Sequence, residues 1–401
     1  MIIVLCYLMV YGLAMYILYR QNLLSVTLGI TVTLSWLATL VAAYYSFLIQ
    51  VGDPAFYFNS PDNHFGVISQ HQFTVWFAQT LIKPLARGDY FLTYLGFACF
   101  GFIGRVLSVL FFYHVCQTHQ SEIAQKRAFF FGPGQWVCAL LLLWPTLVFW
   151  GSLLGKDSLQ YCFIFLLLYS LVAESIPNVG RVIMGVVSIS MLILIRPYNS
   201  ALMTIAICCM MLIGNFRLSN RLLGLGVILV LGAIAWHVMY NAYTINLLNL
   251  NWVMKYGLVQ QMKQHHGTAI TMHLSTSMDY WLNLPWTFFA NAFLPLPGWY
   301  TTNLHAWLTA ILNCIFVYIA ATGLLWFVFK RPKLLALYYF NYLMLMLGWC
   351  FAGFLLLAAV NTNLGLADRQ KIPYVAMFIL FYGAIQFIKW LQQHKATIDV
   401  E

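Results

Sequence analysis

The chain has 401 residues, of which 62% are hydrophobic and only 7% are charged, and its formal net charge is +10. A soluble domain is about half apolar and about a quarter charged, so this composition excludes an ordinary soluble enzyme. The basic residues are scattered along the chain, a pattern that gives no indication of nucleic-acid binding. We therefore expect an integral membrane protein that has membrane lipids among its partners.

Apolar runs of about 20 residues, the length of a membrane-spanning helix, recur from one end of the sequence to the other. They predict an all-α polytopic membrane protein that forms a single integral membrane domain over residues 1–401. The first run lacks a basic start and a small-residue cleavage site, and we interpret it as a retained helix. We expect about eleven transmembrane helices, at residues 1–19, 23–49, 90–113, 136–150, 159–173, 182–195, 200–214, 222–240, 306–329, 335–360 and 374–391.

The distribution of Lys and Arg predicts how these helices are oriented. With the N-terminus outside, eleven of the 20 basic residues fall on the inner side and eight on the outer side. The short basic segment 330–333 weighs most, because positive charge concentrates in short cytoplasmic loops. We expect a multi-pass protein of the bacterial inner (cytoplasmic) membrane with a cytoplasmic C-terminus. Arg105 lies within a span, where it either pairs with a carboxylate or lines a wet cavity.

This orientation predicts two long segments on the outer, periplasmic face, 50–89 and 241–305, which carry interfacial helices. In the first segment, Asp53 follows directly on the second predicted span. A partly buried carboxylate there could act as a general base on an acceptor hydroxyl, and the alternative is an ordinary turn residue before a proline. Further along, Trp76 and Phe77 are expected on the membrane side of an amphipathic helix that ends near Lys83.

The sequence GSLLGKDSL, at residues 151–159, brings charge between two apolar runs. Its glycines permit a tight turn, and Asp157 is a suitable N-cap for the helix that follows. A helix N-terminus attracts anions such as phosphate, and Lys156 would strengthen that attraction. The alternative is a capped turn with a lysine that reaches the water interface, and the residues alone leave both open. We expect Asp157 to cap the helix and to orient Lys156.

Further cations are predicted at the same outer interface. Arg196 ends a predicted span immediately before Pro197, and an arginine so close to hydrocarbon usually has a partner. Its planar fork suits the phosphate of a lipid-linked substrate, although lipid head groups would serve as well. Arg369 and Lys371 precede the final span, next to Asp368. The sequence therefore predicts that cations from distant parts of the chain converge at this interface.

Aromatic residues and prolines gather in segment 284–307, which includes Trp299. The segment is either an aromatic belt at the membrane interface or a platform on which a sugar or a polyprenyl chain stacks. His265, His266 and His273 have no carboxylate or cysteine at ligand spacing, so we predict neither a metal nor a cofactor. The nine cysteines have no CxxC spacing, and we interpret them as small core residues.

Taken in chain order, these motifs resemble a known pattern. They are GD-P-A-x-Y at 52–57, P-x-x-x-F-W-G-S-x-x-G-K-D at 145–157, R-P at 196–197, F-x-P-x-P-G-W at 293–299 and D-R-x-x-x-P at 368–373. The chain resembles bacterial polytopic proteins of polysaccharide and lipopolysaccharide assembly clusters, similar to O-antigen and exopolysaccharide polymerases and to GT-C glycosyltransferases. The G-K-D motif is the most specific part. Residues 304–324 contain no glutamate, a departure from the family pattern.

The resemblance implies a GT-C-like or polymerase-like fold. It also implies a membrane glycosyltransferase or polysaccharide polymerase that uses a sugar or glycan linked to undecaprenyl (pyro)phosphate at the periplasmic face. Asp53 would activate the acceptor, and cations would stabilise the charge that develops on the phosphate. The expected substrate-binding residues are Lys156, Asp157, Arg196, Arg369, Lys371, Tyr57 and Trp299.

A flippase or transporter of lipid-linked glycans is the alternative, as is a non-catalytic subunit that works with other subunits of a glycan assembly or secretion system. A transporter commonly has charges along its mid-membrane path and internal repeats, whereas here the charges gather at one face. This distribution favours an enzyme. An acyl- or phosphoethanolamine-type transferase ranks last, because the inner segments offer only His114 and His119.

Overall fold

The computed structural model describes residues 2–49, 54–60, 70–116, 129–213, 277–297, 304–334, 340–360 and 364–398, together with isolated positions between 222 and 237. Within these ranges the chain is almost entirely helical and contains no strand. The chain divides into two compact units. Unit 1 comprises Met1–Ser200 and Gly383–Glu401, and unit 2 comprises Ala201–Tyr382.

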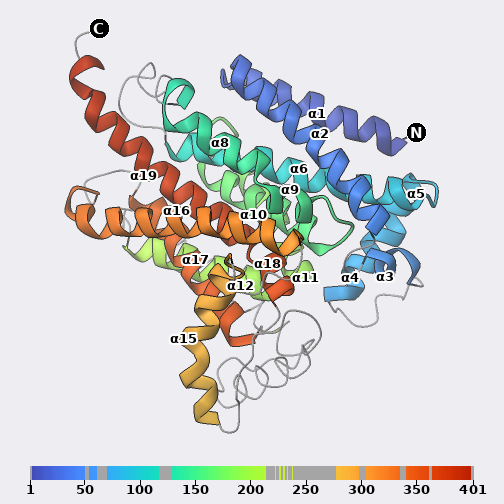
Figure 1. Ribbon diagram of the computed structural model, residues 1–401. Helices are drawn as coiled ribbons and strands as arrows, with labels where there is room; N and C mark the ends of the chain where they lie inside the picture. Colours follow the sequence, from blue (N-terminus) through green and yellow to red (C-terminus); the bar gives the residue numbers. More distant parts are fainter. Residues whose placement is uncertain are drawn as a thin grey trace. The chain divides into compact units, whose positions relative to one another are not determined.

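Two helices continue from one unit into the other: α12 (Pro197–Ile213) begins in unit 1 and α19 (Ile372–Ile398) ends in it. Figure 1 labels the helices along the chain. The other helices of unit 1 are α1 (Ile2–Arg20), α2 (Val26–Ile49), α3 (Pro54–Asn59), α4 (Gln70–Trp76), the π-helix η1 (Phe77–Ile82), α5 (Lys83–Leu85), α6 (Tyr90–Val115), α8 (Pro133–Leu143), α9 (Pro145–Gly151), α10 (Lys156–Val172) and α11 (Asn178–Ile195). Those of unit 2 are α15 (Ser277–Phe293), α16 (Leu304–Leu334), α17 (Phe340–Val360) and α18 (Leu364–Gln370).

The membrane character predicted from composition is confirmed by the helices. In the described part of the chain, eight helical segments are long and apolar enough to cross a membrane. They are Ile2–Arg20, Val26–Ile49, Tyr90–Val115, Pro133–Gly151, Asn178–Ile195, Trp307–Phe329, Asn341–Ala359 and Ile372–Gln393. The total of eleven stays a prediction, since 222–240 lies largely outside the described residues. The 17-residue helices α10 and α12 are about 26 Å long, slightly short of a roughly 30 Å hydrocarbon core.

Helix α6 forms the core of unit 1, and almost all of its side chains are buried. It runs parallel to α10: Phe100 lies near Phe163, with ring centroids 6.5 Å apart, and His114 lies near Tyr169 at 5.7 Å. Glycine permits this close packing. A Cβ added to Gly104 would meet the Cα of Cys162 at 3.0 Å, and small residues are what allow membrane helices to approach closely.

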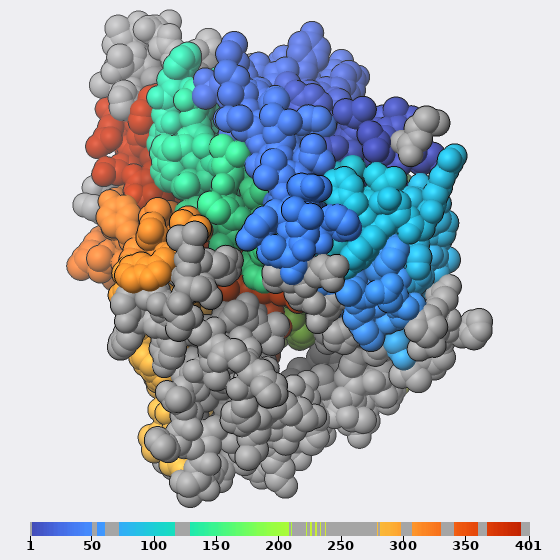
Figure 2. Space-filling model, turned by 45° about the vertical axis from the view of Figure 1, so that its right-hand side comes forward, coloured from blue at the N-terminus to red at the C-terminus, as the bar shows by residue number. Residues whose placement is uncertain are grey.

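Helices α1 and α2 pack as a pair and contribute to the surface of unit 1 (Figure 2). The ring of Tyr7 stacks on Trp36 at 5.1 Å, and its hydroxyl donates to the Trp36 carbonyl at 2.6 Å. Many of the remaining side chains of both helices are large, apolar and exposed, among them Leu8, Leu13 and Val41. In a membrane protein such a face is turned toward lipid.

The predicted span 136–150 is interrupted in the structure. Helix α8 ends at Leu143 and α9 begins at Pro145, with Trp144 between them at ψ 118°. Proline causes this break, because its ring disfavours a helical conformation for the preceding residue. After α9, residues 152–155 leave the helix and are all buried. Non-helical backbone at membrane depth is tolerated where protein covers it.

The predicted amphipathic helix near Trp76 is corrected in one respect. Phe77 was expected to face the membrane, but it is buried and packs edge-on against Phe97 and Phe100 of α6. Trp76 and Phe77 are consecutive residues, so their side chains point about 100° apart on a helix. Phe77 therefore turns toward α6 although Trp76 is its neighbour, at the residue where the π-helix η1 begins.

Unit 2 is held together largely by aromatic side chains. Phe316 of α16 lies between Phe354 of α17 and Phe378 of α19, with ring centroids 6.2 and 5.5 Å away. Phe293, at the end of α15, packs on Phe316 at 5.9 Å. These contacts join four helices, and segment 284–293 of the predicted aromatic segment therefore contributes to the protein interior as well as to its surface.

Candidate functional site

Arg196 occupies a break between two helices. Helix α11 ends at Ile195 and α12 begins at Pro197, which leaves Arg196 as the single non-helical residue, with φ −153° and ψ 87°. The proline disfavours a helical conformation at Arg196 and is itself well suited to the first position of a helix. The carbonyl of Arg196 accepts a hydrogen bond from the backbone N–H of Asn199 at 3.0 Å. The Arg-Pro pair thus sets the break that the sequence predicts.

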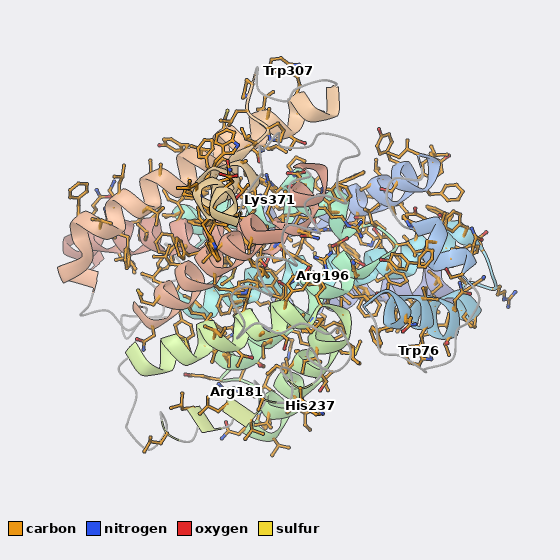
Figure 3. All side chains as sticks on the ribbon, turned by 90° about the horizontal axis from the view of Figure 1, so that it is seen from below. Trp76, Arg181, Arg196, His237, Trp307 and Lys371 are labelled. Atoms are coloured by element: carbon orange, nitrogen blue, oxygen red, sulfur yellow. The ribbon has the colours of Figure 1, made fainter. Side chains whose placement is uncertain are left out.

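The side chain of Arg196 forms a buried ion pair with Asp157. The distance from Nη2 of Arg196 to Oδ1 of Asp157 is 2.5 Å, and the two residues are 1% and 6% exposed. Figure 3 shows Arg196 among the helices, whereas Trp76 lies near the edge of unit 1. The Nε–H group of Arg196 is also buried and has no acceptor among the described residues. The pair therefore leaves one directed donor of the guanidinium unused.

Asp157 does not cap helix α10, contrary to our expectation. The N-cap is Gly155, which offers no side-chain cap, and Asp157 is the second residue of the helix. Its carboxylate is instead directed to Arg196, a residue 39 positions later in the chain. A carboxylate in the first turn still interacts favourably with the helix dipole. Asp157 thus orients Arg196 through a direct ion pair.

The first turn of α10 carries a second cation in addition to the Arg196 that it binds. Lys156 precedes Asp157 in this turn and is partly exposed. Helix N-termini carry a partial positive charge, and the backbone N–H groups of this turn have no side-chain cap from Gly155. The four residues before it, from Ser152 to Gly155, are buried. Lys156 is therefore the residue of this turn that an approaching anion would meet first.

Arginines fix α10 to α11 at both ends. At the far end of α10, Arg181 of α11 donates from Nε to the carbonyl of Ser170 at 3.0 Å and from Nη2 to that of Leu171 at 2.7 Å. These bonds satisfy carbonyls that the helix C-terminus leaves without an intrahelical donor. Since Arg196 holds the other end, the two helices form a hairpin in which the first turn of α10 has a fixed position.

Arg105 is held by neutral groups. It is fully buried and donates from Nε to Oγ of Ser35 at 3.4 Å, from Nη1 to the carbonyl of Leu147 at 3.2 Å, and from Nη2 to Oγ1 of Thr39. In the described residues its acceptors are hydroxyls and a carbonyl, so the carboxylate partner that was one of the two predicted alternatives is not seen there. Its neighbour Gly104 abuts Tyr161, which places Arg105 about one helical turn deeper than Asp157 along α10.

In unit 2, Lys371 is buried in a shell of acceptors. Its ammonium lies 3.1 Å from Oδ1 of Asp368, 3.0 Å from Oδ1 of Asn313 and 3.4 Å from the carbonyl of Leu294. An ammonium group has three N–H donors: Lys371 donates hydrogen bonds to Asn313 and to the carbonyl of Leu294, and Asp368 lies at ion-pair distance. Lys371 is 2% exposed and lies among helices in Figure 3. This geometry favours a structural clamp between α15, α16 and α18–α19 over direct contact with a phosphate. Arg369 is also buried.

Tyr57 is fully buried in α3, which favours a packing role. Gln79 of η1 donates to the carbonyls of Tyr57 and Phe58, at 2.9 and 2.5 Å. Lys83 donates to the Phe58 carbonyl at 3.0 Å and lies 4.3 Å from the centre of its ring. The end of α3 is thereby fixed to η1 and α5. Asp53, which precedes α3, lies outside the described residues, as does Trp299.

Several residues of the site were not found from the sequence. The sequence uses Arg181 only to predict topology, and Gln160, four residues after Lys156, falls inside the predicted span 159–173 with no role assigned to it. Ser35 and Thr39 could have been found from their spacing, since two hydroxyl residues four positions apart in an apolar helix lie on one face. Gln160 could have been found because it is the polar residue one turn into α10.

Comparison with known proteins returns no match: no family model, no curated protein and no solved structure is similar to this chain. In the described part of the chain, no group of three or more His, Cys, Asp or Glu side chains could hold a metal ion. The predicted histidines 265, 266 and 273 lie outside that part.

Proposed function

We propose that this protein is a membrane glycosyltransferase or polysaccharide polymerase that takes a sugar or glycan from a polyprenyl-(pyro)phosphate donor. The observation that carries the proposal is the buried Arg196–Asp157 pair at the start of α10. It holds a guanidinium, whose Nε–H has no acceptor among the described residues, at the helical turn that also carries the partly exposed Lys156. A planar guanidinium, a lysine and an uncapped helix N-terminus all favour an oxyanion such as phosphate.

Breaking the bond between the sugar and the phosphate leaves negative charge on the phosphate. Donors that are already in position stabilise such charge without reorganising, and Asp157 keeps Arg196 in position. Lys156 and Arg196 are the residues that we propose hold the leaving phosphate, with Asp157 as the positioning residue. Asp53 remains the proposed base for the acceptor hydroxyl, at the periplasmic face of the inner membrane.

The test separates the charge of the site from its contribution to the fold. Removing one partner of a buried ion pair costs about 3–5 kcal/mol, whereas replacing both by apolar residues is often nearly neutral. The double variant Asp157→Leu with Arg196→Met is expected to fold and yet to lose binding of undecaprenyl phosphate and surface glycan. Arg181→Met is the matched control, because it removes an arginine bonded to the other end of α10.

Normal surface glycan from the folded double variant would reject the assignment of Arg196. Lys156→Ala and Asp53→Asn complete the set. We expect Lys156→Ala to weaken binding of undecaprenyl phosphate, and Asp53→Asn to leave binding intact while abolishing transfer. Normal glycan in all three would reject the glycosyltransferase proposal itself.

A second candidate, a flippase or transporter of lipid-linked glycans, is favoured by two observations. Arg105 is buried in the middle of α6, and the backbone at residues 152–155 leaves the helix while buried. Interrupted helices and charges at depth are features of transporter binding sites. Purified protein in liposomes distinguishes the two candidates: a transporter moves the lipid-linked glycan between leaflets without cleaving it, whereas the enzyme releases polyprenyl (pyro)phosphate.

A further inference from the structure

Gln160 is a buried polar residue whose amide has no hydrogen-bond partner within the described part of the chain. It lies in α10, is 1% exposed, and neither its Oε1 nor its Nε2 has a hydrogen-bond partner among the described residues. A buried amide without partners is costly, because it loses its bonds to water and gains none. An unsatisfied group of this kind in a folded protein calls for a functional explanation.

Helix geometry places this amide on the face of α10 that carries the candidate anion site. At 3.6 residues per turn, Gln160 is rotated by about 40° from Lys156 and about 60° from Asp157, so it lies between them. Side chains on a helix lean toward its N-terminus and cover the preceding turn. The amide of Gln160 is therefore directed over the first turn of α10, where Asp157 holds Arg196.

We propose that Gln160 contacts the sugar of the donor and recognises its hydroxyl groups through hydrogen bonds. This inference depends on the proposed function of the same site. An amide presents one acceptor and one donor group side by side. Neighbouring sugar hydroxyls each donate and accept, so a pair of them satisfies both ends. An ionised phosphate only accepts and would leave Oε1 unsatisfied, which is why the amide matches the sugar better than the phosphate.

The arrangement divides recognition between two parts of one turn. Lys156 and the Nε–H of Arg196 hold the phosphate, and Gln160, one turn deeper, receives the sugar attached to it. Because Gln160 is covered in this structure, the sugar has to displace side chains around the first turn of α10. The approach starts from Lys156, which is the partly exposed residue of this face.

The experiment compares two probes on the purified full-length chain: undecaprenyl phosphate, and undecaprenyl phosphate that carries a single hexose. We expect the wild type to bind the hexose-bearing lipid at least about tenfold more tightly, the effect of two net hydrogen bonds. Gln160→Met and Gln160→Leu should bind both lipids equally, should keep the affinity for undecaprenyl phosphate, and should melt no lower than the wild type. Gln21→Met is the matched control, since the amide of Gln21 bonds Tyr169 near the opposite end of α10 at 2.8 Å.

The outcomes separate this inference from the proposed function. If Gln160→Met keeps the preference of the wild type, or if the wild type has no preference, the role of Gln160 is overturned while phosphate binding by Arg196 stands. If the wild type binds neither lipid, the proposed function fails and the inference fails with it. Loss of preference in both Gln160 variants, with preference kept in Gln21→Met, supports the inference.

Discussion

The close contact between α6 and the end of α9 predicts that a larger side chain at Gly101 destabilises the protein. A Cβ added to Gly101 would lie 1.8 Å from the carbonyl oxygen of Gly151 and 2.6 Å from its carbonyl carbon. Ordinary contacts of a Cβ begin at 3.4 Å, so the two backbones must separate by about 1.5 Å, close to a carbon–carbon bond length. Gly151 directly precedes the buried turn that leads into α10, and the site would move with it.

The magnitude of this effect follows from two opposing terms. Overpacking of a well-packed interior costs about 1–3 kcal/mol, and contact with rigid backbone makes the upper end appropriate. Alanine stabilises a helix by about 1 kcal/mol relative to glycine through its higher helix propensity, which offsets part of this cost. We expect Gly101→Ala to lose about 2 kcal/mol, a fall in Tm of roughly 4–8 °C at the scale for larger domains.

The assay is thermal unfolding of the purified protein in detergent, with Gly12→Ala of α1 as the matched control. An added Cβ at Gly12 would meet nothing within 4 Å, so the same substitution there should leave Tm unchanged or raise it. If Gly101→Ala melts at or above the temperature of Gly12→Ala, then α6 and α9 do not approach as closely as the structure has them, and the argument for a fixed turn before α10 is refuted.

Three further outcomes are expected. Arg105→Met should destabilise the protein by about 2–4 kcal/mol, seen as a lower Tm, because it leaves the hydroxyls of Ser35 and Thr39 buried with fewer partners; an unchanged Tm would contradict this. Arg196→Met alone should cost about 3–5 kcal/mol and the double variant with Asp157→Leu much less, so additive losses in the melting curves would argue against a buried pair. Lys371→Met should also lower Tm. Lys371→Arg should lower it as well, because a guanidinium does not fit the site that holds the ammonium group. A wild-type Tm for Lys371→Arg would disprove the clamp.

Much of the fold follows from local properties of the sequence. Long apolar runs give helices whatever their neighbours are, so the membrane helices of the described chain fall close to the predicted ranges. The Arg-Pro pair predicts the break at 196 because a proline constrains the residue before it. The break at Trp144 was not predicted, although Pro145 has the same effect there. The burial of Phe77 was not predicted either, because it depends on packing against α6, which the local sequence does not show.

The charged residues of the candidate site can be located from the sequence, but their partners cannot. A cation or carboxylate that interrupts an apolar run is visible in the amino-acid sequence. The sequence did not determine partners, because Asp157 and Arg196 meet only when α10 and α11 fold into a hairpin. The same folding encloses Lys371 with Asp368 and Asn313 and buries Gln160 away from any hydrogen-bond partner among the residues that the structure describes. Pairing between distant residues depends on which helices pack together, and that choice is made by shape and burial across the whole chain.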